Sequence, residues 1–166
     1  MKMKFATGMG LALVILSGVV PVTAQEHEHE MEGGQEGMAA MHDPQFFTNE
    51  AFANFPFSEA VQVGPFLYLS GQIGTDPETS QLVSGGIGPE TGQTMENIKA
   101  TVEKYGSSME RVIKCTVFLA DIAEWPAMNE VYATFFPGNK PARSAMGTSG
   151  LALGARVEIE CIGVVG

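Results

Sequence analysis

Arg143, Glu158 and Glu160 are the side chains whose types and spacing could do chemistry on a small molecule. The guanidinium of Arg143, which follows Pro141 at the start of a predicted strand, can bind a carboxylate through two parallel hydrogen bonds. Glu158 and Glu160 are two positions apart on a late predicted strand, so both carboxylates point to the same face. That face is either exposed to solvent or part of a cleft between subunits. By spacing alone, a surface salt bridge for Arg143 and a solvated face for the glutamates are the simpler interpretations.

Histidine and cysteine chemistry is restricted by position. His27, His29 and His42 are the three histidines, so a Ser–His or Cys–His pair is excluded after residue 42. A weak metal-binding tail is conceivable around His27 and His29, but a solvated linker is the simpler interpretation. Cys115 and Cys161 lie inside predicted strands and could pair in an oxidising compartment. Because strand geometry rarely suits a cross-strand disulfide, we expect two buried free thiols.

Strands and two amphipathic helices position these side chains. Apolar residues recur at helical spacing in 89–105 and 123–136, and they alternate or run continuously in the expected strands. The predicted strands are 60–63, 66–70, 111–120, 142–148 and 156–165. The order β-β-α-β-α-β-β predicts an α+β domain with both helices on one face of a sheet.

The two faces of this predicted sheet differ in composition. One set of alternating residues on strand 111–120 should face the helices: Ile113, Cys115, Val117 and Leu119. The opposite face would carry a mixture of charged and apolar side chains: Thr116, Phe118, Glu158 and Glu160. A small domain with a half-covered sheet often assembles with copies of itself to bury that face.

The chain divides into three parts. Residues 1–24 are predicted to be a secretory signal peptide, with Lys2 and Lys4 before a short apolar run and Ala24 before the cleavage point. That run is too short for a confident membrane span, so a cleaved signal is favoured over the alternative, an uncleaved anchor. We therefore expect an exported protein, periplasmic or secreted. Residues 25–50 are predicted to be a disordered acidic linker rich in His, Glu and Gly. Residues 51–166 form the folded part.

Charge excludes one class of partner. The 166 residues carry a formal net charge of −10, with 45% hydrophobic and 17% charged residues. The folded part is only mildly acidic, because seven acids without any Lys or Arg lie in 25–50. Without an excess of basic residues to neutralise phosphates, nucleic-acid binding is not expected.

Several short motifs between residues 55 and 164 occur in a characteristic order. They are Ser70-Gly71-Gln72-Ile73, Asn97-Ile98-Lys99-Ala100, Met128-Asn129-Glu130-Val131-Tyr132, Phe135-Phe136, Pro141-Ala142-Arg143-Ser144 and Val157-Glu158-Ile159-Glu160. In this combination the folded part resembles the Rid family, the reactive intermediate deaminases also called the YjgF family.

The resemblance implies a fold, an assembly and an activity. The fold would be chorismate-mutase-like (bacillary type), assembled as a homotrimer whose strands form a central barrel with three clefts between subunits. The activity would be hydrolysis of 2-iminobutanoate-like imino or enamine acids to 2-oxo acids and ammonia, without a metal or cofactor. Arg143 would bind the substrate carboxylate and Glu158 would hold the attacking water or shuttle its proton.

The resemblance also implies substrate-binding positions. Ser70, Gly71 and Asn129 match motif positions that line the cleft, and backbone groups around Ala145 could supply further donors and acceptors. Phe57 is also implied to bind substrate, as an aromatic wall of the cleft. Well-known deaminases of the family have Tyr where this chain has Phe57, and Cys where it has Ala145. The alternatives are a non-catalytic trimer that binds a carboxylate metabolite or acts as a holdase, and RNA cleavage, which the acidic charge disfavours.

Overall fold

A computed structural model of the chain describes residues 43–48 and 53–166. The predicted signal peptide, residues 1–24, lies outside these residues. Of the predicted linker, residues 25–50, the structure describes 43–48. Within the described part, no helix is long and apolar enough to cross a membrane.

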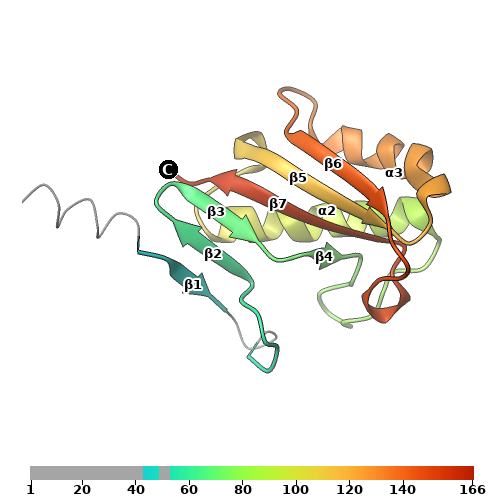
Figure 1. The fold of residues 1–166 in the computed structure, drawn as a ribbon, viewed down its shortest axis with the longest axis horizontal. Coiled ribbons are helices and arrows are strands. Elements are labelled where there is room, and N and C mark those ends of the chain that lie inside the picture. The colour runs from blue at the N-terminus through green and yellow to red at the C-terminus, as the bar shows by residue number, and fades with distance from the viewer. Residues whose placement is uncertain (1–42, 49–52) are drawn as a thin grey trace, which may run out of the picture.

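The described residues form one seven-stranded sheet (Figure 1). Two helices of this part of the chain cover one face of the sheet, as the sequence predicts. The order across the sheet is β1-β2-β3-β7-β5-β6, with β4 also pairing with β7. Among the strands that the structure describes, β5 and β6 run parallel, and the other pairs are antiparallel. The strands are β1 Gln45–Phe47, β2 Ala60–Val63, β3 Phe66–Leu69, β4 Gln72–Ile73, β5 Val112–Leu119, β6 Ala142–Gly147 and β7 Val157–Val164. The helices are α2 Ile87–Lys104 and α3 Trp125–Tyr132, with 3₁₀ turns at Met109–Arg111, Ile122–Glu124, Ala133–Phe135 and Ala152–Gly154.

The core lies between the helices and the sheet. On α2, Met95, Ile98 and Val102 are fully buried at the spacing expected of one helix face. They meet the inward residues of the two central strands, which are Cys115, Val117 and Leu119 on β5 and Val157, Ile159 and Cys161 on β7. Burial of this apolar surface is the main favourable contribution to folding.

One residue predicted for the inward face lies outside it. Ile113 is 44% exposed, whereas Val112 beside it is 6% exposed. The pairing of β5 with β7 shifts between Val112 and Lys114, which is a β-bulge. The extra residue of a bulge breaks the alternation of side chains, so the inward set begins at Val112 and resumes at Cys115.

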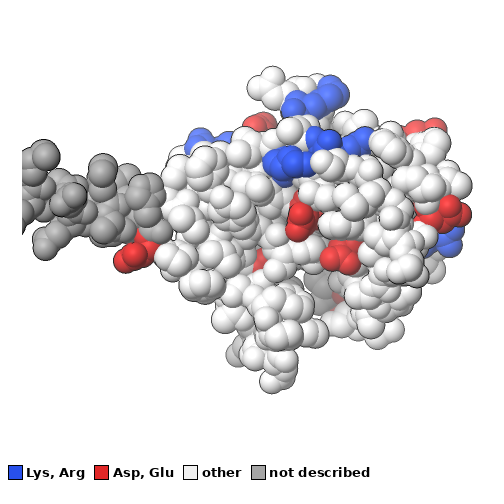
Figure 2. Space-filling model, viewed as in Figure 1, with Lys and Arg blue, Asp and Glu red and all other residues white. Residues whose placement is uncertain are grey.

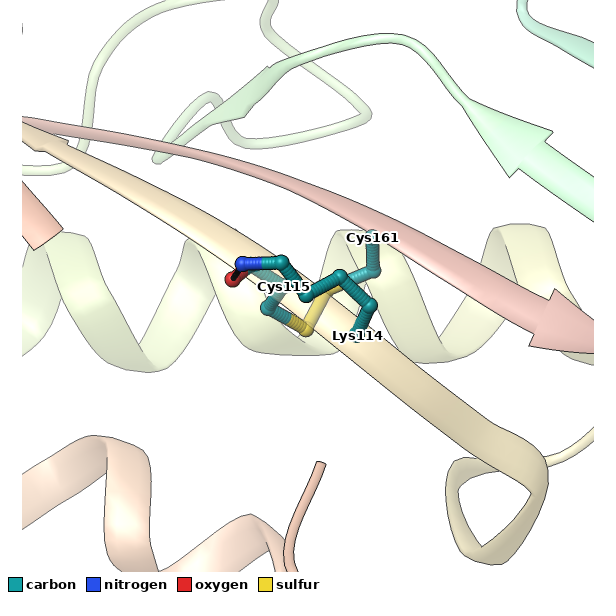
Figure 3. Close-up of a disulfide and its surroundings, with 3 residues drawn as sticks. All are labelled: Lys114, Cys115 and Cys161. Carbon is teal, nitrogen blue, oxygen red and sulfur yellow. Dashed lines mark hydrogen bonds between the residues drawn. A yellow bond between two sulfur atoms is a disulfide. The ribbon is translucent and has the colours of Figure 1, made fainter. Parts of the chain in front are cut away.

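The two cysteines form a disulfide, and the expectation of free thiols is wrong (Figure 3). Cys115 on β5 and Cys161 on β7 are direct partners in the antiparallel ladder, with their Cα atoms 4.1 Å apart. That separation matches the closer of the two kinds of antiparallel residue pair, in which facing side chains approach each other. The bond lies beneath α2, with both residues almost fully buried.

Two short strands were not predicted. β1 lies within the range assigned to the linker, and it pairs with β2 while Phe47 stacks on Tyr105 with ring centroids 4.4 Å apart. β4 has two residues and pairs with β7. Strands of two or three residues carry too little alternation to be recognised from sequence. The predicted second helix also differs, because only its middle part, α3, is α-helical.

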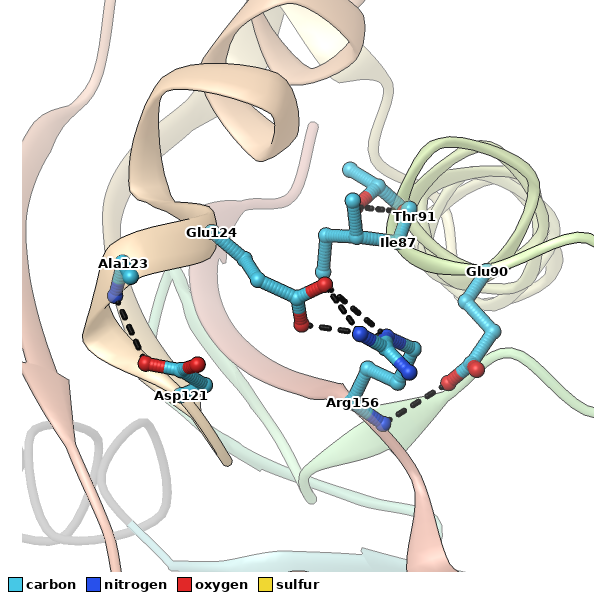
Figure 4. A network of polar contacts seen from close by, with 7 residues as sticks. All are labelled: Ile87, Glu90, Thr91, Asp121, Ala123, Glu124 and Arg156. Atoms are coloured by element: carbon cyan, nitrogen blue, oxygen red, sulfur yellow. Dashed lines mark hydrogen bonds and ion pairs between the residues drawn. The ribbon is translucent and has the colours of Figure 1, made fainter.

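A polar network joins the starts of both helices to the start of β7 (Figure 4). Glu90 on α2, which is 6% exposed, accepts a hydrogen bond of 2.8 Å from the backbone N–H of Arg156. The Arg156 guanidinium forms an ion pair with Glu124, which immediately precedes α3. The network therefore fixes α3 relative to the sheet, and α3 carries one of the predicted site residues.

Candidate functional site

Arg143 lies between the edge strand β6 and helix α3. Its ladder partner is Cys115, so its side chain points to the helix-covered face of the sheet. There its Nη1 donates a hydrogen bond of 2.6 Å to Oδ1 of Asn129. The guanidinium carbon lies 4.8 Å from the ring centroid of Tyr132 and 5.9 Å from that of Trp125. Arg143 is therefore held by side chains of α3 rather than by a surface salt bridge.

Asn129 was predicted to bind substrate, and the structure places it against Arg143. Its carbonyl oxygen fixes one edge of the guanidinium, so Asn129 positions Arg143 whether or not it also contacts a ligand. Ala145, another predicted residue, lies two positions along β6 and packs against the core from the same face.

The Tyr132 ring packs against the Arg143 guanidinium, but the hydroxyl group of Tyr132 lowers the stability of the fold. The hydroxyl is buried and has no hydrogen-bond partner among the described residues, and burial raises the pKa of Tyr132 to about 12. We expect Tyr132→Phe to leave the free energy of unfolding unchanged or to raise it by about 1 kcal/mol, because it removes an unsatisfied polar group. Urea denaturation measures this, and a loss of more than about 1 kcal/mol would reveal a partner for the hydroxyl.

Glu158 lies on the opposite, open face of the sheet. Its ladder partners are Phe118 on β5 and Ile73 on β4, and its side chain is partly buried. Burial, and then the negative charge of Glu160, raises the pKa of Glu158 above its usual value. A carboxyl group with a raised pKa holds a proton more readily than an ordinary glutamate, which suits a group that accepts a proton and passes it on.

Gly71 makes room for the Glu158 carboxyl group. A Cβ built on Gly71 would overlap Oε1 of Glu158 and lie 2.9 Å from its Cδ. A side chain at residue 71 would therefore push the carboxyl group out of its present place.

We expect Gly71→Ala to lower turnover at least tenfold while the fold stays intact, because only the flexible end of Glu158 must move. Steady-state kinetics together with a thermal melt would check this. Gly88→Ala is a matched control, since its added Cβ would meet only Val131 at an ordinary 4.0 Å. Equal turnover of Gly71→Ala and the wild type would contradict the placement of Glu158.

Ser70 and Phe57 lie on the chain segments around β2 and β3. The Ser70 hydroxyl donates a hydrogen bond of 2.6 Å to the carbonyl oxygen of Ser58, which ties the end of β3 to the segment before β2. Phe57 is 48% exposed and stacks on Phe55, with ring centroids 5.2 Å apart. Ser70 thus fixes the backbone next to Gly71. Phe57 directly precedes Ser58, the residue that Ser70 binds, and presents an exposed aromatic ring.

Six of the seven predicted site residues form two groups on opposite faces of one sheet, and Phe57 belongs to neither group. Arg143 pairs with Cys115 and Glu158 pairs with Phe118. Because positions 115 and 118 of β5 differ by an odd number, their side chains point to opposite faces. We call the group around Arg143 the cationic half-site (Arg143, Asn129, Ala145) and the group around Glu158 the carboxylate half-site (Glu158, Gly71, Ser70). One chain by itself does not bring the two half-sites around one small molecule.

Trp125 and Tyr132 are the contacts of Arg143 that sequence reasoning missed. Both were assigned to the core side of the second helix on their spacing. The spacing of Trp125, Asn129 and Tyr132, four and then three residues, also places all three on one helix face. That pattern, with an asparagine among aromatic residues, was the available signal.

Comparison with known proteins identifies the family. The family model described as endoribonuclease L-PSP matches residues 48–165. The chain belongs to this family. Mouse 2-iminobutanoate/2-iminopropanoate deaminase is 44% identical over 111 residues, which are 67% of this chain and 82% of the mouse protein. The predicted resemblance to Rid proteins is therefore confirmed.

Solved structures confirm the fold. The YjgF gene product of Escherichia coli matches with a TM-score of 0.67 and 30% identity, over 72% of this chain and 98% of that one. E. coli TdcF with bound serine matches with a TM-score of 0.65 and 30% identity, over 75% of this chain and 98% of that one. Both solved structures match this chain over nearly their own whole length.

Proposed function

We propose that this L-PSP family protein is an enzyme that hydrolyses 2-imino or enamine acids to 2-oxo acids and ammonia. The names of curated relatives, such as the mouse deaminase, support the reaction class. The observation that carries the proposal is the pair of half-sites: a guanidinium fixed by α3 and a carboxyl group with a raised pKa, both within motifs of the family. The serine bound to E. coli TdcF shows that one relative holds a molecule with an α-carboxylate.

The reaction needs a carboxylate anchor and a proton carrier. Arg143 binds the substrate carboxylate, which places the imine carbon near Glu158. The Glu158 carboxylate accepts a proton from water as the water oxygen adds to the imine carbon. The electron pair of the C=N double bond moves to the nitrogen, which takes that proton from Glu158, and a carbinolamine forms. Glu158 then carries the hydroxyl proton of the carbinolamine to the nitrogen as the C–N bond breaks, so that ammonia leaves and the carbonyl of the 2-oxo acid forms. Water supplies the oxygen, and no redox step is involved.

The site is completed by a second copy of the chain in a homotrimer. β6 is an edge strand, and three basic residues lie on it or next to it: Arg143 on β6, Lys140 just before it, and Lys114, the ladder partner of Ala142. Figure 2 shows several basic side chains at the edge of the molecule where β6 lies. The open sheet face carries Glu158 and Glu160. Contact between the β6 edge of one copy and the open face of the next would pair opposite charges. A head-to-tail contact of this kind can close into a ring.

The open face also has apolar side chains for such a contact. Phe66, Tyr68 and Met146 are between 40% and 45% exposed. Their burial against another copy would stabilise the assembly by roughly 25 cal/mol per Å² of apolar surface.

The direct test is release of ammonia and 2-oxo acid from imines that an amino-acid oxidase generates in the assay. We expect faster release with the wild-type protein than with buffer, and the buffer rate with Arg143→Ala. Lys99→Ala is the matched control, because it removes a positive charge of α2 whose side chain is 45% exposed and lies in neither half-site, so it should keep wild-type turnover. Full turnover in Arg143→Ala would refute the role of this residue. No turnover from well-folded wild-type trimers would favour the alternative, a carboxylate-binding protein without catalysis.

RNA cleavage, which the name of the family model suggests, has little support in this chain. The described residues contain no histidine, and the basic groups are outnumbered by acids. Histidine acid–base chemistry is therefore not available within the described residues, and the excess of acidic residues disfavours binding of a phosphate backbone.

The charge of Glu160 gives a prediction for pH dependence. Glu160 raises the pKa of Glu158, and the proposed role needs the ionised form of Glu158. Glu160→Gln should therefore shift the acidic limb of the kcat/KM profile to lower pH. Burial is the larger cause of the raised pKa, so the shift is partial. A profile that is unchanged or moves to higher pH would contradict the proposed proton carrier.

We also propose that the protein is exported, periplasmic or secreted. The Cys115–Cys161 disulfide supports this, because disulfides persist mainly in oxidising compartments. The predicted signal peptide, residues 1–24, gives the means of export. Cell fractionation with immunodetection of the mature N-terminus tests both statements, and recovery of the uncleaved chain from the cytoplasm would refute them.

A further inference from the structure

Three side chains on one face of α3 surround the Arg143 guanidinium. Asn129 accepts a hydrogen bond in the plane of the group, at 2.6 Å from Nη1. Tyr132 and Trp125 present aromatic rings, with centroids 4.8 Å and 5.9 Å from the guanidinium carbon. Both distances are within the range of cation–π attraction. We call this arrangement the α3 clamp (Trp125, Asn129, Tyr132).

The two rings differ in exposure. Tyr132 is 7% exposed and forms the buried part of the clamp, with Phe136 packed against it at a centroid distance of 5.0 Å. Trp125 is 37% exposed at the first turn of α3. Trp125 is therefore the ring of the clamp that solvent, and a molecule arriving from solvent, can reach.

The clamp leaves part of Arg143 available. Arginine has five N–H donors in one plane. Among the residues that the structure describes, the Arg143 guanidinium donates one hydrogen bond, to Asn129. Its other in-plane N–H groups remain for a ligand. The rings restrict the tilt of this plane, which reduces the ordering that a carboxylate would otherwise impose on a flexible arginine.

We propose that Trp125 is a positioning residue for carboxylate binding, because its ring holds the Arg143 guanidinium in the orientation that receives the carboxylate. The ligand, a 2-imino or 2-oxo acid, is taken from the proposed function, and this inference rests on it. Trp125 acts through Arg143, so its loss should weaken substrate binding much more than the chemical step.

Trp125 also supplies the readout, because it is the single tryptophan of the chain. Its intrinsic fluorescence reports the environment of Arg143 in the unlabelled, full-length protein. Titration with 2-oxobutanoate should give a saturable change in emission. Butanamide, which lacks the carboxylate, should give none, and Arg143→Ala should lose the response to 2-oxobutanoate. The same change in Arg143→Ala, or no saturable change in the wild type, would overturn the proposal.

Kinetics separate positioning from a structural role. Trp125→Ala should raise KM about threefold to tenfold and change kcat less than about twofold, as expected for loss of one cation–π contact. Trp125→Phe keeps an aromatic ring and should restore most of the lost affinity. Phe46→Ala is the matched control, because it removes an aromatic side chain that is 68% exposed at the opposite edge of the sheet. Equal KM values for Trp125→Ala and the wild type would overturn the proposal.

Failure of this inference differs from failure of the proposed function. If the protein binds 2-oxobutanoate with a change in Trp125 fluorescence but releases no ammonia, the role of Trp125 is supported and the deaminase function is refuted. If the protein releases ammonia and Trp125→Ala has the KM of the wild type, the deaminase function is supported and the role of Trp125 is refuted. Thermal melts and size-exclusion chromatography of each variant exclude unfolding or dissociation as the cause.

Discussion

A mixture of two inactive variants, Arg143→Ala and Glu158→Gln, should recover about a quarter of the wild-type turnover when their subunits are exchanged. The two half-sites lie on opposite faces of each sheet, so one chain would supply Arg143 and its neighbour Glu158. In an equal random mixture, half of the cationic half-sites and half of the carboxylate half-sites are intact. About one site in four then combines two intact halves.

The experiment is complementation by co-refolding. Each variant alone is expected to lose at least about 100-fold in turnover, because one removes the carboxylate anchor and the other the proton carrier. The two are denatured without reductant, which keeps the disulfide, mixed, refolded and assayed beside each variant refolded alone. A mixture of Arg143→Ala with itself, carrying a different tag, controls for the refolding step. Activity that stays at the level of the single variants would show that each site is built within one chain.

Loss of the disulfide should lower the thermal midpoint of the domain by about 10 °C. The Cys115–Cys161 bond closes a loop across a sequence separation of 46 residues. The chain-entropy account assigns about 4 kcal/mol to a loop of this length, and measured values are commonly about 2–4 kcal/mol. For a domain of this size, 1 kcal/mol corresponds to a few degrees.

Comparison of oxidised and reduced wild-type protein isolates the cross-link, because both keep the sulfur atoms in the core. The reduced form is prepared by refolding with reductant. The Cys115→Ala/Cys161→Ala variant serves as the control, since its midpoint should not respond to reductant. Equal midpoints for oxidised and reduced wild type would mean that the neighbouring ladder and core already fix these strands without the bond.

The sequence was sufficient for the main elements but not for their local irregularities. Helical spacing of Met95, Ile98 and Val102 correctly predicted α2 and its buried face. Ile113 was misplaced because a β-bulge changes the parity of a strand and leaves no mark in a pattern of alternating apolar residues. The cysteines were misjudged because pairing depends on strand register, which the spacing of 46 residues does not reveal.

For the candidate site, too, the sequence predicted some features and not others. Residue types alone indicated that Arg143 suits a carboxylate and that Glu158 and Glu160 share a face. The two faces of β5, which separate Arg143 from Glu158, follow only from the ladder partners Cys115 and Phe118. The α3 clamp required the distance between β6 and α3, which is a tertiary relation.

Strand β7 has a consequence for the timing of folding. It is the last strand in chain order, yet it lies in the middle of the sheet between β3 and β5. The cationic half-site is contained in one continuous stretch, from α3 through β6, and can form from local contacts. The carboxylate half-site joins residues almost ninety positions apart, Ser70 and Glu158, and the disulfide also needs Cys161. During synthesis the strand that joins β3 to β5 is therefore missing until β7 has emerged. Until then the two parts of the sheet, β1-β2-β3 and β5-β6, are not connected by hydrogen bonds.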